Sequence, residues 1–376
     1  MKVLVNALSA RKGGIVTYTN NLLTAFEERG IDVTVAVSEE FEARNRESIS
    51  RLNISRYSAI KRLLWEQSTW RRFVKKHNPD VLFSSANFGL LNCPVKQILL
   101  LREGGLFDPF YLANMTAPQG VWNAVNRYFR RNLMLMSAMT ADQIITPTQA
   151  MRDMVLKWQP KIAENCAVNP YGTIDQVFKP TEEKKRIWRE DGVLKLLYVS
   201  VYYPHKVPNL ICQAVDQLTK LGIRTHATIT MSIDEFGEMD GSVLDEAIVR
   251  DANRRGMITL GHHDYGDLPK LYRSHDVFVF PSVSETFGHP MAEAMSSAMP
   301  VVVSDTPVNR EICGDAALYF EPFMVSQLIE KLLEFDRDPL LRERLLNLGR
   351  ERVVSRFGWD GHFDRLIETM KQIVAS

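Results

Sequence analysis

The sequence predicts an α/β protein of two domains, each a doubly wound parallel sheet with helices on both faces. The chain has 376 residues, and single hydrophobic cores stop growing at roughly 250–300 residues. In both halves, short β-type runs alternate with helical patterns, which is typical of parallel sheets. A charged segment containing Pro180 and ending in a glycine, Val177–Gly192, separates the two series.

The first half carries the first alternating series. An amphipathic stretch, Thr17–Arg29, follows the first strand, and longer helical segments separate the later strands. The strand candidates are short apolar runs: Val3–Asn6, Val33–Val37, Val81–Phe83, Gln97–Leu101 and Gln143–Thr146. We assign residues 1–178 to this domain.

The second half repeats the pattern, and we assign residues 185–356 to it. Its strand candidates are rich in Val, Leu, Ile and Thr: Lys195–Val201, Thr225–Thr230, Met257–Leu260, Val277–Pro281 and Val301–Ser304. After Pro322 the pattern is helical, and the apolar residues of Trp359–Val374 recur at intervals of three and four. Such a stripe needs a partner, so we expect the helix at 359–376 to pack back on the first domain.

The composition excludes several classes of protein. Lys and Arg total 46 against 45 Asp and Glu, so no global field favours nucleic acid. The four cysteines are scattered without a C-x-x-C pair, which fits a reducing compartment. Apolar runs are too short for a spanning helix or a secretory leader. We expect a cytoplasmic protein, at most peripheral to the inner face of a membrane.

Two glycines, Gly13 and Gly14, follow the first strand and open the first long helix. Their backbone amides can approach an anion closely, and the helix dipole favours a phosphate. The G-x-G-x-x-G and Walker patterns are both absent. By itself such a pair is more often a flexible turn.

The segment from Val277 to Met295 carries the most chemical information. It is predicted to be a buried strand, a polar loop with Glu285, and a helix that begins at Pro290 with Glu293 in its first turn. Carboxylates accept from sugar hydroxyls, and loop amides donate to anions. The alternative is that Glu293 only favours the helix dipole while Glu285 is solvated.

This segment resembles the signature of the retaining GT-B glycosyltransferases of the group 1, family 4 type, in which seven residues separate two glutamates. The family includes bacterial mannosyl-, glucosyl- and galactosyltransferases and sucrose synthase. The matching residues extend over nearly the whole chain: Ser284–Gly288, Glu293–Met295, Ala298–Val302, Asp305, Glu311, Gly314–Ala317, Gly13–Gly14, Lys206, Pro170–Phe178 and Trp359.

The resemblance implies a GT-B fold whose two domains face across a cleft, with the acceptor on the first domain and a nucleotide-diphosphate sugar on the second. Glu293 would hold the ribose and Glu285 the donor sugar. Lys206 and the Gly13–Gly14 amides would neutralise the diphosphate without a metal or other cofactor. The donor contacts would be completed by the loop residues Thr286, Phe287, Gly288 and His289. The nucleotide base would lie near Gly261 and His262, whereas the alternative, which the sequence favours, is that His262 and His263 are ordinary surface residues.

Two departures from the family pattern are visible. The family places a Gly-Arg pair before the lysine, whereas this chain has Ser200–Val201; Arg11, Lys12 or Arg102 could replace the missing cation. The family also places a histidine after the fourth strand, where this chain has Arg102 and Glu103. These two residues either act in positioning, with Glu103 a conceivable acceptor base, or form a structural ion pair.

The resemblance therefore predicts a retaining, metal-independent hexosyltransferase that uses a glycan, lipid-linked or other hydroxyl acceptor in polysaccharide or glycoconjugate biosynthesis. The departures leave an alternative, a catalytically silent nucleotide-sugar-binding or partner subunit of the same fold. The nucleotide base, sugar, linkage and oligomeric state are not readable from the sequence.

A basic stretch with aromatic residues, Lys61–Lys76, suggests a peripheral membrane contact. It has six cations, one acid and the apolar residues Leu63, Leu64, Trp65, Trp70 and Phe73. A second basic cluster near aromatic residues could belong to the same surface: Arg127, Arg130 and Arg131 with Trp122, Tyr128 and Phe129. The alternative is an amphipathic helix that packs its aromatics on the sheet and solvates its charges.

Overall fold

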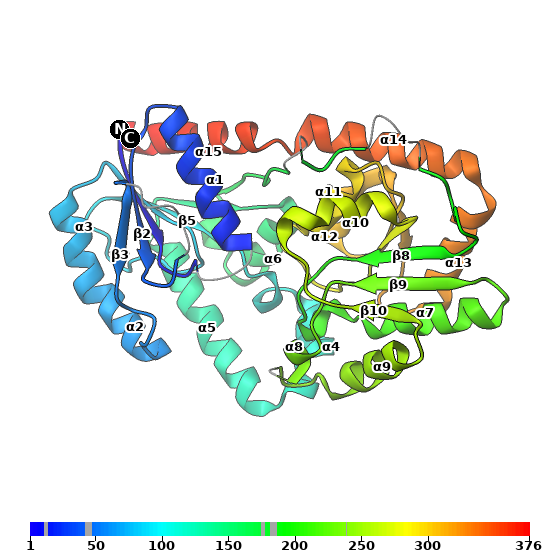
Figure 1. Ribbon diagram of the computed structural model, residues 1–376. Coiled ribbons are helices and arrows are strands. Elements are labelled where there is room, and N and C mark those ends of the chain that lie inside the picture. Colours follow the sequence, from blue (N-terminus) through cyan, green and yellow to red (C-terminus); the bar gives the residue numbers. More distant parts are fainter. Residues whose placement is uncertain (11–13, 42–46, 174–176, 181–185, 238) are drawn as a thin grey trace. The chain divides into compact units, whose positions relative to one another are not determined.

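The computed structural model describes residues 1–10, 14–41, 47–173, 177–180, 186–237 and 239–376 (Figure 1). The chain divides into two compact units. Unit 1 comprises Met1–Phe107, Arg127–Pro170 and Asp360–Ser376, and unit 2 comprises Asp108–Asn126 and Tyr171–Trp359. Each unit is built around its own parallel sheet, so the predicted fold class is confirmed.

The sheet of unit 1 has the strand order β3-β2-β1-β4-β5-β6-β7. The strands are β1 (Lys2–Ala7), β2 (Asp32–Ser38), β3 (Ile49–Leu52), β4 (Val81–Ser84), β5 (Lys96–Leu100), β6 (Gln143–Thr146) and β7 (Cys166–Val168). The chain winds outward from β1 to β3 and then returns to place β4 on the other side of β1. The order therefore reverses between β1 and β4, a point at which open α/β sheets bind ligands. Three strands were not predicted, β3 and β7 of this sheet and β13 (Leu318–Phe320) of the second sheet, and all three are short and lie at sheet edges.

Helices cover this sheet. They are α1 (Gly14–Glu28), α2 (Ala59–Trp65), the π-helical turn η1 (Glu66–Trp70), α3 (Arg71–His77), η2 (Gly104–Leu106), α5 (Val121–Met139), α6 (Gln149–Trp158), η4 (Pro160–Ile162) and α15 (Trp359–Ala375). The terminal helix α15 lies against α1. His362 Nε2 is 3.1 Å from the Tyr18 hydroxyl, and Arg29 forms ion pairs with Asp360 and Asp364.

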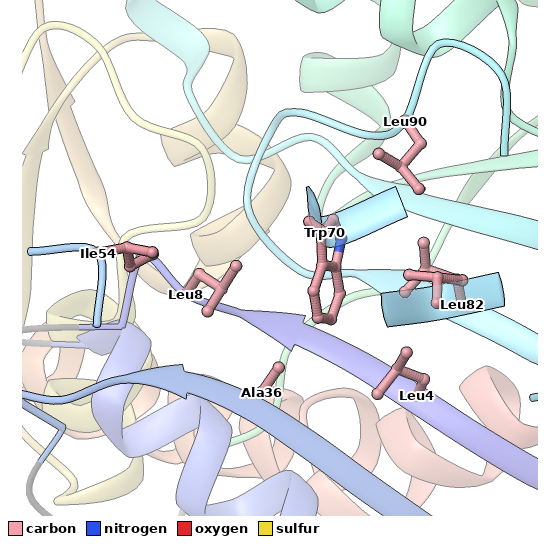
Figure 2. Close-up of a cluster of buried hydrophobic side chains, with 8 residues drawn as sticks. Leu4, Leu8, Ala36, Ile54, Trp70, Leu82 and Leu90 are labelled. Carbon is pink, nitrogen blue, oxygen red and sulfur yellow. The ribbon is translucent and has the colours of Figure 1, made fainter. Parts of the chain in front are cut away.

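A hydrophobic cluster lies between the sheet of unit 1 and the helical segment of η1 and α3. Figure 2 shows Trp70 among side chains from β1, β2 and β4. Its members are Leu4, Leu8, Ala36, Ile54, Trp70, Val74, Leu82 and Leu90. Trp70 is only 1% exposed, and Trp65 and Phe73 pack against the cluster. The aromatic residues of Lys61–Lys76 therefore belong to the core, as the amphipathic-helix alternative predicts. Burying these large aromatic side chains gives a lower free energy than leaving them in solvent.

The sheet of unit 2 has the order β10-β9-β8-β11-β12-β13. The strands are β8 (Leu194–Tyr198), β9 (Thr225–Ile229), β10 (Ile258–Leu260), β11 (Val277–Phe280), β12 (Val301–Ser304) and β13 (Leu318–Phe320). Here the winding reverses between β8 and β11, which pair directly. The carboxyl edge of these two strands is the expected ligand position of the unit.

The helices of unit 2 are η5 (Pro204–Lys206), α7 (Asn209–Lys220), α8 (Asp234–Gly237), α9 (Val243–Arg254), η6 (Tyr265–Asp267), α10 (Leu268–Ser274), α11 (His289–Ser296), α12 (Pro307–Cys313), η7 (Gly314–Ala316), α13 (Val325–Arg337) and α14 (Pro339–Arg356). Two further elements come from an earlier part of the chain: α4 (Pro109–Met115) and η3 (Ala117–Gln119). They belong to unit 2, where the Tyr111 ring of α4 lies 5.7 Å from the His205 ring. The first residues of α5 belong to unit 2 as well, and Asn123 donates to Asp240 over 2.8 Å. Among the described helices, none is long and apolar enough to cross a membrane.

Candidate active site

The reversal point of unit 2 brings two predicted residues together. Lys206 lies in η5, in the loop that follows β8, and Glu285 lies in the loop that follows β11. Because these strands are neighbours, their loops meet, and Lys206 Nζ forms an ion pair with Glu285 Oε1. The two side chains are 12% and 11% exposed. A backbone hydrogen bond of 2.9 Å, from Val283 N–H to His205 O, holds the two loops against each other.

The loop that carries Lys206 is fixed from inside the unit. The buried Tyr198 hydroxyl donates to the Lys206 carbonyl over 2.8 Å, and Lys206 Nζ lies 5.5 Å from the centroid of the Phe280 ring. These contacts come from the ends of β8 and β11. The position of the cation is therefore determined by the sheet and does not depend on a surface side chain.

The helix α11 begins beside this ion pair. Gly288 is its N-cap with φ 77°, a left-handed backbone conformation that favours glycine. The first helical residue is His289, one position earlier than predicted, with Pro290 second. Phe287 and Gly288 are buried, and within the described residues their amides donate to no protein acceptor. Buried N–H groups without partners are rare, so these two can serve a ligand.

Glu293 occupies different surroundings from Glu285. It is the fifth residue of α11, and the prediction that it lies in the first turn is wrong because the helix starts at His289. The carboxyl is 6% exposed; Tyr272 Oη is 2.9 Å from Oε2 and Tyr265 Oη is 3.4 Å from Oε1. Burial raises the pKa of Glu293 to about 7, while the two tyrosine hydroxyls act in the opposite direction.

The two tyrosines were not predicted. The Phe178 ring meets each of them edge-on, with ring centroids 5.6 Å apart. Tyr272 lies inside α10, where a single tyrosine at helical spacing carries no signal beyond core burial. Tyr265 belongs to the loop after β10 that includes Gly261 and His262. Gly261 N–H donates to Ile229 O over 3.3 Å, and His262 is exposed.

Aromatic rings surround the start of α11. The His289 ring stacks on Tyr171 at 5.2 Å and on Trp359 at 6.1 Å between centroids. Gly172 permits this arrangement, because a Cβ there would lie 2.4 Å from the Trp359 backbone. The preceding residue, Phe287, is edge-on to Tyr171 at 5.5 Å. These contacts restrict the backbone at the site where the helix presents its amides, and sequence spacing gives no indication of them.

Of the other predicted residues, Thr286 follows Glu285 in the loop of unit 2, whereas Gly14, Arg102 and Glu103 lie in unit 1. Gly14 is the first residue of α1, and a Cβ there would meet nothing within 4 Å. Gly13, with the candidate cations Arg11 and Lys12, lies outside the described residues. The sequence analysis did not predict a cation near the end of β1: Arg62 donates to the hydroxyl of Ser9, which follows this strand, over 3.0 Å.

Arg102 and Glu103 follow β5 but do not pair with each other. Glu103 pairs with Arg130 at 2.6 Å, so its structural ion pair has a different partner from the one predicted. The Arg102 amide donates to Asn87 Oδ1 over 2.7 Å. Its Nη1 is buried and has no hydrogen-bond partner within the described residues. A buried guanidinium nitrogen in that state is suited to an anionic or hydroxylated ligand.

The position where the family has its arginine is neutral in this chain. Val201 is 51% exposed, and the Ser200 amide is bound to Thr230 Oγ1 at 3.0 Å. Lys206 therefore carries the positive charge of this loop.

Two family models match the chain. The model described as "Glycosyl transferases group 1" matches residues 180–352, and "Glycosyltransferase Family 4" matches residues 12–173. Together they cover most of the sequence. The chain belongs to the group 1, family 4 type of glycosyltransferases.

Two curated relatives illustrate the similarity. The O-antigen chain mannosyltransferase RfbU of Salmonella typhimurium is 24% identical over 336 residues, 86% of this chain and 87% of that one. The O-antigen chain mannosyltransferase B of Escherichia coli is 29% identical over 175 residues. That second match covers 46% of this chain and spans only 45% of the relative's length.

Solved structures share the fold. Sucrose-phosphate synthase from Thermosynechococcus elongatus has a TM-score of 0.79 at 17% identity and covers 100% of both chains. Anabaena HepE, solved in complex with UDP-glucose, has a TM-score of 0.76 at 14% identity, covering 99% of this chain and 100% of that one. The fold is GT-B.

Proposed function

We propose that this glycosyltransferase moves a hexose-type sugar, with retention of configuration and without a metal ion, from a nucleotide-diphosphate sugar to a hydroxyl acceptor of glycan or glycoconjugate biosynthesis. The observation that carries the proposal is the Lys206–Glu285 pair beside the unpartnered amides of Phe287 and Gly288. A cation, a carboxylate and free amide donors at one sheet edge suit a sugar diphosphate. The mannosyltransferase names of the relatives and the UDP-glucose bound by HepE agree with this class of donor.

In this proposal unit 2 binds the donor. Lys206 Nζ faces the diphosphate and offsets the charge that develops as the glycosidic bond breaks. Glu285 accepts from hydroxyls of the donor sugar. Glu293 accepts from the ribose hydroxyls while Tyr265 and Tyr272 hold its two oxygens from the protein side.

The proposed transfer needs few protein groups. The acceptor oxygen bonds to the anomeric carbon on the face from which the diphosphate departs, and the acceptor proton passes to the departing phosphate oxygen. Unit 1 presents the acceptor, with Arg102 as a contact and Glu103 held by Arg130. Lys206 supplies the positive charge that a divalent metal provides in other transferases.

A thermal-shift screen tests donor binding. The protein is titrated with UDP-, GDP-, ADP- and dTDP-sugars, with and without EDTA, and a shift confined to one base identifies the nucleotide. The expected shift persists in EDTA. If no nucleotide sugar raises the melting temperature, donor binding is wrong.

Turnover tests the chemistry separately. With the identified donor, we expect slow hydrolysis and faster transfer to hydroxyl acceptors, and NMR of the product should show the donor's anomeric configuration. Binding without turnover across a broad acceptor panel would instead identify a silent donor-binding subunit, which the neutral Ser200–Val201 loop favours. An inverted product, or activity lost in EDTA, would refute the corresponding part of the proposal.

A further inference from the structure

A segment from the first half of the sequence belongs to unit 2. Unit 1 includes the chain up to Phe107 and again from Arg127, but the residues between them, Asp108–Asn126, group with unit 2. We call Asp108–Asn126 the strap. It contains α4, η3 and the first residues of α5. Residues of the strap can therefore act on the loops of unit 2 that follow β8 and β11.

The strap is attached to unit 2 near each of its ends. Near its start, the Phe110 ring stacks on the Phe323 ring, with centroids 5.9 Å apart. Near its end, Asn123 Nδ2 donates to Asp240 Oδ2 over 2.8 Å. Neither contact involves the loop that carries Lys206, so the strap has attachments that are independent of the site.

Between these two attachments, Tyr111 meets the residue that precedes Lys206. Tyr111 is only 7% exposed, and its ring lies edge-on to the His205 ring, with centroids 5.7 Å apart. The His205 ring also stacks on the Tyr203 ring, again at 5.7 Å. Aromatic rings at these separations attract each other beyond the effect of their burial. The three rings therefore form a packed cluster on the turn that ends at Lys206.

The backbone of this turn has a conformation that its own sequence does not favour. The turn, η5, is closed by hydrogen bonds from Lys206 N–H to Tyr203 O over 2.8 Å and from Val207 N–H to Pro204 O over 3.4 Å. It ends at Val207, whose φ of 45° lies in the left-handed region that β-branched residues rarely adopt. Such a conformation persists only where the surrounding structure imposes it. The ring cluster supplies contacts of this kind from outside the turn.

We propose that Tyr111 of the strap is a positioning residue, which acts through His205 to hold η5 in the conformation that places Lys206 at the donor diphosphate. The inference rests on the function proposed above for Lys206. Without the Tyr111 ring, η5 would relax from its unfavourable conformation, and Lys206 Nζ would be less often beside Glu285. Because the charge on the diphosphate develops in the transition state, the loss should appear in kcat more than in donor binding.

Steady-state kinetics of the full chain with its identified donor tests this role. Tyr111→Ala should lower kcat roughly 10–100-fold and change the donor KM less than about threefold, because a small misplacement of a catalytic group slows the chemical step. Tyr111→Phe keeps the ring and should recover most of the loss. Tyr111→Leu replaces Tyr111→Ala if circular dichroism shows that the alanine variant does not fold. An unchanged kcat in Tyr111→Ala, or a Tyr111→Phe variant that is equally slow, would overturn the proposal.

The matched control is the neighbouring residue of the same helix. Phe110→Ala also removes an aromatic ring from α4, but this ring stacks on Phe323 and not on His205. We expect its kcat to stay near that of the wild type, because the contact between Tyr111 and His205 remains. An equal loss of kcat in Phe110→Ala would mean that attachment of the whole strap matters and that Tyr111 has no specific role.

A double-mutant cycle tests whether Tyr111 acts through Lys206. In Lys206→Ala the cation is already absent, so adding Tyr111→Ala should lower kcat little further. Independent effects would multiply, and the double variant would then be roughly 10–100-fold slower than Lys206→Ala. That result would overturn the proposal. Single-turnover conditions with excess enzyme keep the slow variants measurable.

Hydrogen–deuterium exchange tests the hold on η5 without requiring activity. The Lys206 and Val207 amides close the turn, so they should exchange faster in Tyr111→Ala than in the wild type, and at the wild-type rate in Phe110→Ala. Unchanged exchange in Tyr111→Ala would overturn the proposal. Faster exchange in that variant, when the wild type itself transfers no sugar, would support the hold on η5 and refute the proposed function. The two failures are therefore distinguishable.

Discussion

Glu285 lies in the loop before α11 and Glu293 lies in α11 itself, yet the surroundings of the two carboxylates differ. Glu285 meets a cation across two neighbouring loops and keeps 11% of its side chain exposed. Glu293 meets two phenol hydroxyls in a buried space, where its pKa rises to about 7. The comparison shows that the neighbouring side chains from η5, η6 and α10 decide what each carboxylate can do. A charged pair suits a diphosphate sugar, and a hydroxyl-lined carboxyl suits hydroxyl recognition.

The largest effect on the transfer reaction should come from removing the cation that pairs with Glu285. Lys206→Ala is expected to lower kcat/KM for transfer about 10²–10³-fold, because the developing charge on the diphosphate loses its stabilising partner. The matched control is Lys220→Ala, which removes a lysine that is 72% exposed on α7. Steady-state kinetics with the preferred donor measures both, and a fully active Lys206→Ala variant would refute the phosphate role.

The buried surroundings of Glu293 should make the stability of the protein depend on pH. The native state holds the Glu293 proton up to about pH 7, whereas an unfolded glutamate releases it near 4.5. Between these values the native state binds more protons, so the free energy of unfolding falls as pH rises. The loss attributable to Glu293 should be about 3 kcal/mol and complete above pH 7.

The difference between wild type and Glu293→Gln isolates this contribution. Glutamine does not titrate, so urea unfolding from pH 4.5 to 8 should show the wild type losing stability relative to the variant. Burial lowers the pKa of His275 to about 4, which acts in the opposite direction but equally in both proteins. A constant difference across this range would show that Glu293 is ionised throughout.

Substitutions of Tyr272 and Tyr265 should have smaller effects, and the two effects on the donor KM should differ in size. Tyr272→Phe removes the 2.9 Å hydrogen bond to Glu293 from a fully buried ring, and Tyr265→Phe removes the 3.4 Å bond. We expect the donor KM to rise roughly tenfold in the first variant and less in the second, with kcat nearly unchanged, because a hydrogen bond that positions the carboxyl contributes about 0.5–1.5 kcal/mol. Equal effects on kcat and KM in both variants would indicate a general disturbance of unit 2.

The sequence predicted the site unevenly. Motif residues such as Lys206 and Glu285 were identified, and the strand order explains why they meet. Tyr265 and Tyr272 were not predicted as partners of Glu293. The spacing of an isolated tyrosine does not distinguish a partner of a carboxylate from an ordinary core residue. The sequence also left open whether Trp65 and Trp70 face the sheet or a lipid surface, because a helix with apolar residues on several sides does not show from sequence which of them is buried.

The sequence by itself determined the two alternating α/β series, the position of the glutamate loop and the family. These depend on local periodicity, on residues such as Gly288 that tolerate a positive φ, and on motif spacing, all of which act over short stretches of chain. Only the tertiary structure decided which strands are neighbours, that Glu103 pairs with Arg130, and which partners Glu285 and Glu293 meet. Those contacts join residues far apart in sequence, and their free energy depends on burial and distance, which exist only after the chain has folded.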